Sequence, residues 1–138
     1  HHASGGLLPI RFVLFASIGA IGLVVHLLVL TGLIESLGQD WFASSQIAAT
    51  IAAMASNFLL NNEITYRSYR YRGVAMLAGF AQFALLCSVG ALANIDIASS
   101  LFARERVWWA AGLAGALIGV VWNYAASSTI VWRKRRTV

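Results

Sequence analysis

Hydrophobic residues are gathered into long blocks along this chain, and polar residues fall mainly between them. The four apolar blocks cover about residues 10–34, 42–64, 74–95 and 107–131. A helix needs roughly 20 predominantly apolar residues to cross a bilayer, and each block is long enough. The pattern therefore predicts an all-α integral membrane protein with four transmembrane helices. We expect one membrane domain over residues 10–136, preceded by a linker or trimmed remnant at residues 1–9.

The second and fourth blocks end in similar polar stretches, 66 residues apart. In each stretch an Asn is followed by an aromatic residue, and ten positions later comes an Arg that follows another aromatic residue. The matched pairs are Asn57 with Asn123, Tyr66 with Trp132 and Arg67 with Arg133. A weaker match links the first and third blocks at an offset of 68, for example Gly22 with Gly90. The chain is therefore predicted to be two copies of one helical hairpin, arranged as a parallel repeat.

The distribution of charged residues predicts how the chain is oriented in the membrane. Only 11% of the residues are charged, against about 25% in a typical soluble domain. Eight of the ten basic residues fall at the ends and in the middle connector, whereas Arg104 and Arg106 lie in the last connector. The positive-inside rule then places both termini and the middle connector in the cytoplasm. Because the basic residues flank apolar blocks and form no helical face, we expect contact with anionic lipids and no nucleic-acid partner.

Polar side chains near the ends of the spans are the candidates for binding. Asn57 and Asn123 either line a cleft that binds a phosphate or sugar, or hydrogen-bond a neighbouring helix as packing contacts. The arginines offer bidentate donors to a phosphate, or act only as topology determinants. The candidates are Asn57, Asn61, Asn62, Tyr66, Arg67, Arg70, Arg72, Asn123, Trp132 and Arg133.

Three further polar residues lie in or near the spans. Glu63 is predicted to pair with Arg67 at helical spacing i, i+4. His26 and Gln82 lie inside the first and third spans, and either has an intramembrane polar role or bonds a neighbouring helix. The sequence has no Gly-rich phosphate loop, no metal-ligand spacing and no nucleophile beside a base. We therefore expect no catalytic site, no metal and no cofactor in this segment.

The span-end motifs resemble the GtrA-like family. The residues that carry the resemblance are Arg11-Phe12, Asn57-Phe58-Leu59-Leu60-Asn61-Asn62, Thr65-Tyr66-Arg67, Asn123-Tyr124 and Val131-Trp132-Arg133. More narrowly, the chain is similar to the C-terminal membrane domain of bacterial polyprenyl- or dolichyl-phosphate mannosyltransferases. The resemblance covers all four spans, from about Leu8 to Arg136. The second copy departs from the first, because Ser127-Ser128 replaces Asn61-Asn62 and makes any site asymmetric.

The resemblance implies a membrane domain that anchors a polyprenyl-phosphate glycosyltransferase and presents the lipid phosphate at the cytoplasmic face of the bacterial inner membrane. The implied partners are polyprenyl phosphate or its sugar-linked form, membrane lipids, and a fused or separate cytoplasmic glycosyltransferase domain. Homo-oligomerisation is left open. The alternative is translocation of the lipid-linked sugar, although His26 stands where many stand-alone relatives carry Asp or Asn. A drug/proton antiporter is less favoured because no carboxylate lies well inside the first span.

Overall fold

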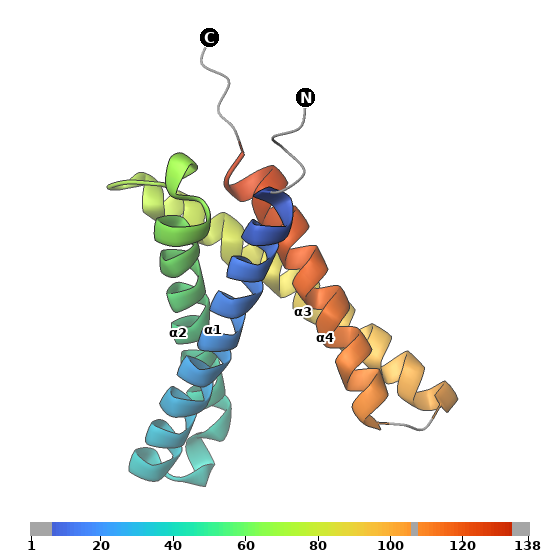
Figure 1. Cartoon of the computed structure of the whole chain (residues 1–138). Helices are drawn as coiled ribbons and strands as arrows, with labels where there is room; N and C mark the ends of the chain where they lie inside the picture. The colour runs from blue at the N-terminus through green and yellow to red at the C-terminus, as the bar shows by residue number, and fades with distance from the viewer. Residues whose placement is uncertain (1–6, 106–107, 134–138) are drawn as a thin grey trace. The chain divides into compact units, whose positions relative to one another are not determined.

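The computed structural model describes residues 7–105 and 108–133, and the regular structure within them is helical. The long helices are α1 (Leu7–Leu37), α2 (Phe42–Leu60), α3 (Ala75–Glu105) and α4 (Trp108–Ala126) (Figure 1). The short segments are the 3₁₀ turns η1 (Gln39–Trp41) and η3 (Arg67–Tyr69), and the π-helical segments η2 (Asn61–Thr65) and η4 (Ser127–Val131). The predicted all-α class is confirmed.

Three stretches of the described residues are long and apolar enough to cross a membrane: Ile10–Leu37, Gln39–Thr65 and Ala75–Leu92. A shorter apolar stretch, Ala116–Val131, follows in α4 and η4. Each stretch overlaps one of the four blocks that the hydrophobic pattern predicts, and the first two extend a few residues beyond their blocks. The chain is therefore a multi-pass membrane protein.

Helices α1 and α3 extend beyond their predicted spans. Helix α1 begins at Leu7, so that Pro9 lies in its first turn, where a missing N–H breaks no intrahelical hydrogen bond. Helix α3 continues to Glu105, through most of the connector that we predicted at residues 96–106. That stretch is polar enough to end an apolar block, but it contains no Gly or Pro and is rich in residues with high helix propensity.

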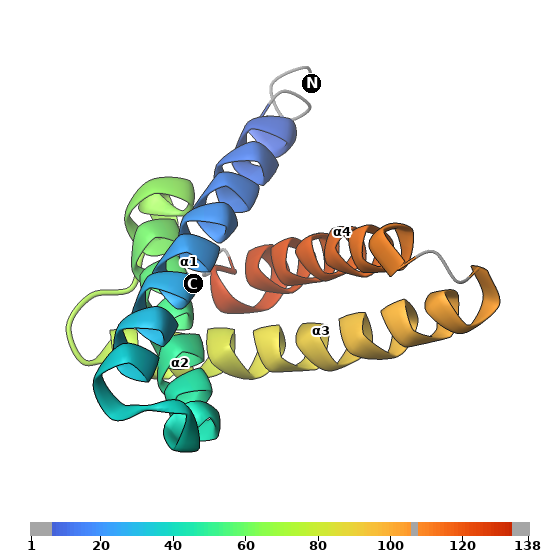
Figure 2. The same cartoon turned by 90° about the horizontal axis from the view of Figure 1, so that it is seen from below.

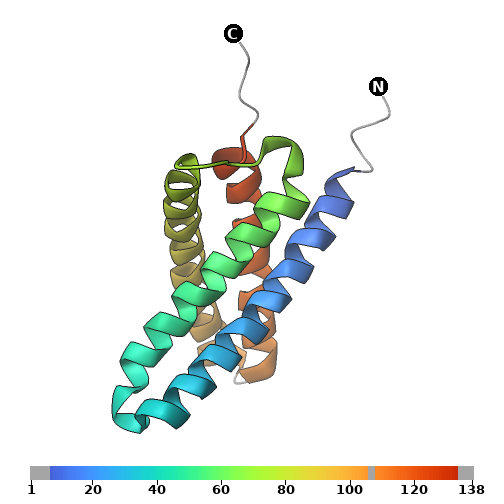
Figure 3. The same ribbon diagram turned by 90° about the vertical axis from the view of Figure 1, so that its left-hand side faces the viewer.

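The chain divides into two compact units, and each is a helical hairpin. In the first unit α1 packs against α2, as the view in Figure 3 shows. Gly38 ends α1 with a positive φ of 92°, which favours glycine, and its N–H donates to the Ile34 carbonyl at 2.8 Å. In the second unit α3 packs against α4 (Figure 2).

Both hairpins end in a π-helical turn at equivalent positions of the repeat. The Tyr66 N–H donates to the Asn61 carbonyl at 2.8 Å, and the Trp132 N–H donates to the Ser127 carbonyl at 2.9 Å. Each bond joins residues five positions apart, as in a π-helix. The predicted repeat is thus visible in the backbone of each hairpin end, whereas the π-helical form was not predicted.

Candidate functional site

Asn61 is tied into the end of the first hairpin by its own side chain. Its amide N–H donates to the Asn57 carbonyl at 2.9 Å, and its side-chain oxygen accepts from the Thr65 hydroxyl at 2.7 Å. Asn61 and Thr65 are both buried. These local bonds, which were not predicted from the sequence, stabilise the π-helical turn. Asn62, also buried, donates to Glu63 at 3.5 Å, the limit of a hydrogen bond.

Asn57 and Asn123 occupy the same kind of position in the two hairpins. A Cβ atom on Gly22 would lie 2.6 Å from the Asn57 Cγ atom, and one on Gly90 would lie 2.6 Å from the Asn123 side-chain oxygen. Each amide is therefore seated against a glycine of the other helix of its hairpin. The side-chain oxygens of both residues are buried and accept no hydrogen bond from the described residues.

Glu63 pairs with Arg70, and the predicted pair with Arg67 is wrong. The Arg70 guanidinium donates to the Glu63 carboxylate at 2.9 Å. The α-helical spacing fails because Glu63 lies in the π-helical turn and the chain leaves the helix at Tyr66, with φ −113° and ψ 32°. Arg67 therefore does not continue the helical face that carries Glu63.

The arginines near the hairpin ends differ in whether another side chain engages them. Arg67, Arg72 and Arg133 are exposed, and their side chains make no ion pair or hydrogen bond with the described residues. Arg70 is engaged by Glu63, and Arg11 lies over the Tyr69 ring at 5.7 Å. Three guanidinium groups thus keep all their donors available to an anion.

Aromatic side chains close the end of the second hairpin. Trp132 is buried and makes edge-to-face contacts with Tyr71 and Phe83, at centroid distances of 6.5 and 5.7 Å. The Tyr71 hydroxyl donates to the Val131 carbonyl. A Cβ atom on Gly79 would lie 2.8 Å from the Tyr71 ring, so glycine is needed for this close approach. Trp132 is therefore part of the packing, and Tyr66 is equally buried in the first unit.

A pocket of about 370 Å³ opens beside this aromatic group, within the second hairpin. Its lining residues are Tyr71, Gln82, Thr129, Ile130, Val131 and Arg133. The structure thus brings two predicted residues, Gln82 and Arg133, into one pocket, whereas His26 lies half-buried on α1 in the other unit. The sequence interpretation missed Tyr71 and Thr129 as site residues. Two sequence features could have indicated them. Gly79 leaves room for the Tyr71 ring, and Thr129 stands in the repeat where the first hairpin has Glu63.

The basic residues Lys134, Arg135 and Arg136 and the predicted linker up to Gly6 lie outside the described residues. Within the described part of the chain, no group of three His, Cys, Asp or Glu residues could hold a metal ion. The first hairpin therefore has the exposed Arg67 near its polar end. The second has the exposed Arg72 and Arg133, together with the Gln82 amide and the aromatic group around Trp132.

Comparison with known protein families matches residues 14–132 to the family described as GtrA/DPMS, transmembrane domain. The match covers α2, α3 and α4, most of α1, and both π-helical turns. A search of curated proteins found no significant match. The chain belongs to the GtrA/DPMS transmembrane-domain family, which indicates a membrane component of glycosyl transfer or of sugar-lipid flipping.

Proposed function

We propose that this chain is the membrane domain of a polyprenyl-phosphate glycosyltransferase of the mannosyltransferase type. It anchors a cytoplasmic glycosyltransferase domain, fused or separate, and binds the polyprenyl phosphate that this domain glycosylates. The observation that carries the proposal is that each hairpin of a chain of this family has, at the polar end of its apolar helices, exposed arginines without an ion pair or hydrogen bond to the described residues: Arg67 in the first, Arg72 and Arg133 in the second.

The chemistry of a polyprenyl phosphate fits this arrangement. Its phosphate needs several N–H donors at the membrane boundary, and a guanidinium group offers two in one plane. Its isoprenoid chain needs an apolar surface next to that boundary, which the helices provide. The lipid would therefore place its charge at the hairpin ends and its hydrocarbon along the spans.

The proposed topology puts those ends at the cytoplasmic face of a bacterial inner membrane. All four apolar blocks span the bilayer in this proposal, with both termini inside. The arginine-rich connector, Arg67 to Arg72, is then cytoplasmic, and Glu35 and Asp40 are on the outer side. A nucleotide-sugar donor is available only on the cytoplasmic side, so the lipid phosphate and the transferase domain would meet there.

Sugar-lipid translocation is the second candidate, because family membership leaves it open. The observation in its favour is that the Asn57 and Asn123 side-chain oxygens are buried and accept no hydrogen bond from the part of the chain that the structure describes. In reconstituted vesicles, a translocator would make an inside-facing lipid-linked sugar accessible to an added sugar-modifying enzyme. Our proposal expects the same accessibility with and without the protein.

Native mass spectrometry of the purified chain tests the favoured function. The chain would be titrated with polyprenyl phosphates of graded length, and with a polyprenol and phosphatidylglycerol as controls. We expect retention of polyprenyl phosphate at a defined stoichiometry and weaker retention of both controls. Equal retention of polyprenyl phosphate and phosphatidylglycerol would contradict a specific lipid-binding function.

A further inference from the structure

One ridge of α4 and η4 runs from an apolar groove to the polar pocket. The residues along this ridge follow one another at intervals of four: Leu117, Val121, Ala125 and Thr129. The chain leaves the helix at Trp132, with φ −101° and ψ 47°, and Arg133 lines the same pocket as Thr129. Such a ridge drifts around an α-helix, but the wider π-helical turn of η4 reduces the drift at its polar end. At 1.5 Å per residue the ridge from Leu117 to Thr129 is roughly 18 Å long, a little over half of the hydrocarbon core of a bilayer.

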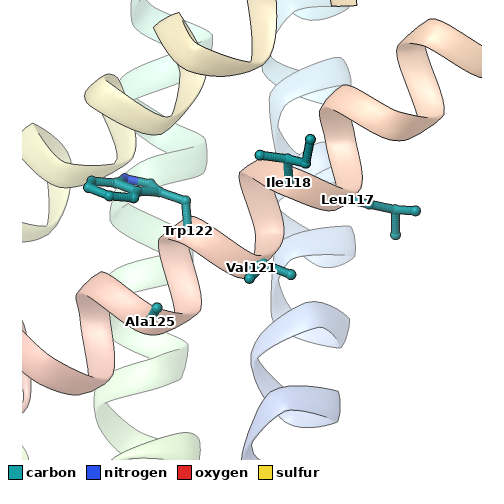
Figure 4. A pocket seen from close by; sticks show the side chains of 5 residues that line it. All are labelled: Leu117, Ile118, Val121, Trp122 and Ala125. Carbon is teal, nitrogen blue, oxygen red and sulfur yellow. The ribbon is translucent and has the colours of Figure 1, made fainter. Parts of the chain in front are cut away.

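The apolar part of the ridge is a shallow groove of about 420 Å³ (Figure 4). It is lined by Leu117, Ile118, Val121, Trp122 and Ala125. Trp122 forms one wall because its indole N–H donates to the Leu86 carbonyl of α3 at 2.9 Å. The groove therefore has an apolar floor and a fixed aromatic side, as a hydrocarbon chain would need.

In the pocket at the polar end of the ridge, two hydroxyl groups already donate hydrogen bonds within the second hairpin. The Thr129 hydroxyl donates to the Ala125 carbonyl at 2.7 Å, and the Tyr71 hydroxyl donates to Val131. The Gln82 amide and the Arg133 guanidinium line the same pocket and make no hydrogen bond with the described residues. The free N–H groups of the pocket thus belong to one neutral and one cationic side chain, which suits an anionic head group.

The first hairpin carries different residues at the equivalent positions. Thr129 corresponds to Glu63, Ala125 to Leu59, and Gln82 to Leu14. The Glu63 carboxylate lies where a second phosphate would have to bind, and like charges at a few ångströms repel each other. Leu59 adds bulk to the ridge, and Leu14 supplies no donor. The first hairpin therefore does not repeat the pocket.

We propose that one isoprenoid monophosphate binds along α4 of the second hairpin, with its phosphate at Gln82 and Arg133 and its first isoprene units in the groove of Leu117, Val121 and Trp122. This proposal rests on the proposed function and gives each chain one binding site for its lipid, which we call the α4 seat. Glu63 keeps the equivalent end of the first hairpin closed to phosphate.

Photocrosslinking of the full chain locates the lipid. The probe is an isoprenyl monophosphate with a diazirine in its first isoprene units, and the labelled peptides are mapped by mass spectrometry. We expect label at residues 117–125, removed by excess polyprenyl phosphate and not by polyprenol. Label spread equally over α2 and α4 would overturn the proposal.

Two substitutions transfer residues of the first hairpin into the α4 seat. Thr129→Glu introduces the carboxylate and should reduce labelling of α4 at least tenfold, whereas the neutral control Thr129→Gln should retain it. Ala125→Leu narrows the groove at an exposed position and should reduce labelling several-fold. Its control is Ala116→Leu, an exposed alanine of α4 that does not line the groove.

The outcomes separate this proposal from the proposed function. If Thr129→Glu and Ala125→Leu label as the wild type does, the α4 seat is overturned, while specific retention of polyprenyl phosphate in native mass spectrometry would still support the proposed function. If the wild-type chain shows no phosphate-dependent labelling and no specific retention, both are overturned. Loss of α4 labelling in the two variants, with retention in both controls, supports the α4 seat.

Discussion

Each hairpin seats an asparagine amide against a glycine, and the two pairs set how closely the helices of a hairpin approach. Gly22 faces Asn57 in the first hairpin, and Gly90 faces Asn123 in the second. Burial of an amide oxygen without a donor is unfavourable by about 1–3 kcal/mol. The close helix packing that glycine permits must offset that cost, so these positions should not tolerate larger residues.

Gly22→Ala should therefore destabilise the first hairpin, by about 1–3 kcal/mol for overpacking. The matched control is Gly19→Ala, three residues earlier on the same helix, where a Cβ atom would meet nothing within 4 Å. Because alanine is about 1 kcal/mol better than glycine inside a helix, the control should be neutral or slightly stabilising. Thermal unfolding in detergent, followed by circular dichroism, measures both. Equal melting temperatures for the two variants would contradict the close Gly22–Asn57 approach.

The Asn61–Thr65 pair should behave as a unit. Thr65→Val keeps the side-chain shape but leaves the Asn61 oxygen without its donor, which should cost about 1–3 kcal/mol. Adding Asn61→Ser should recover part of the loss, because Ser127 and Val131 occupy these positions in the second hairpin. A double-mutant cycle on melting temperature checks the coupling. Strictly additive losses would show that the two side chains do not stabilise the π-helical turn together.

At the scale of elements, the connector between the hairpins contains one tyrosine that contacts the first unit and one that packs in the second. Tyr69 lies under Arg11 in the first unit, and Tyr71 packs on Gly79 and Trp132 in the second. The Glu63–Arg70 pair adds little stability of its own, since its side chains are 55% and 30% exposed and exposed pairs contribute about 0–1 kcal/mol. Its effect is to engage Arg70, whereas Arg67 and Arg72 make no ion pair with the described residues.

Tyr71→Phe should loosen η4 without disturbing η2. The substitution keeps the ring contact with Trp132 but removes the hydrogen bond to the Val131 carbonyl. We expect faster amide hydrogen exchange in residues 127–132, by roughly five- to tenfold for a loss of about 1 kcal/mol. Exchange in residues 61–66 is the internal control. Unchanged exchange in both segments would contradict a structural role for the Tyr71 hydroxyl.

The sequence was sufficient to locate the apolar helices and the hairpin repeat, because both depend on the distribution of apolar residues. It was not sufficient to reveal the π-helical turns. Such a turn bonds residues five positions apart instead of four, so it rotates the residues that follow around the helix axis but leaves the amino-acid composition unchanged. The partner of Glu63 was missed for this reason, since the i, i+4 rule assumes a continuous α-helix. Gln82 and Arg133 could not be linked from the sequence either, because only the packing of α3 on the end of α4 brings them to one pocket.

At the scale of the whole molecule, the charge distribution predicts which face carries the arginines. Single cysteines in a Cys87→Ala background test this in intact cells with a membrane-impermeant maleimide. Ser36→Cys, in the exposed end of α1, should react from outside, and Ser68→Cys, in η3, should react only after lysis. The opposite pattern would place the arginine-rich connector outside and would remove the basis for a cytoplasmic lipid site.

In the proposed function, a defined arginine binds the phosphate of the lipid. The direct measurement is the equilibrium affinity for polyprenyl phosphate and for the matching polyprenol, in the wild type, Arg133→Ala, Arg67→Ala and Arg135→Ala. We predict that the wild type prefers the phosphate and that Arg133→Ala loses roughly tenfold or more, as expected for a charge-assisted hydrogen bond of about 1.5–3 kcal/mol. Arg67→Ala, at the hairpin end that Glu63 keeps closed, and Arg135→Ala should each change the affinity much less than Arg133→Ala, and the polyprenol affinity should not change. Equal losses in all three variants, or no preference for the phosphate, would leave these arginines as topology determinants and contradict the account.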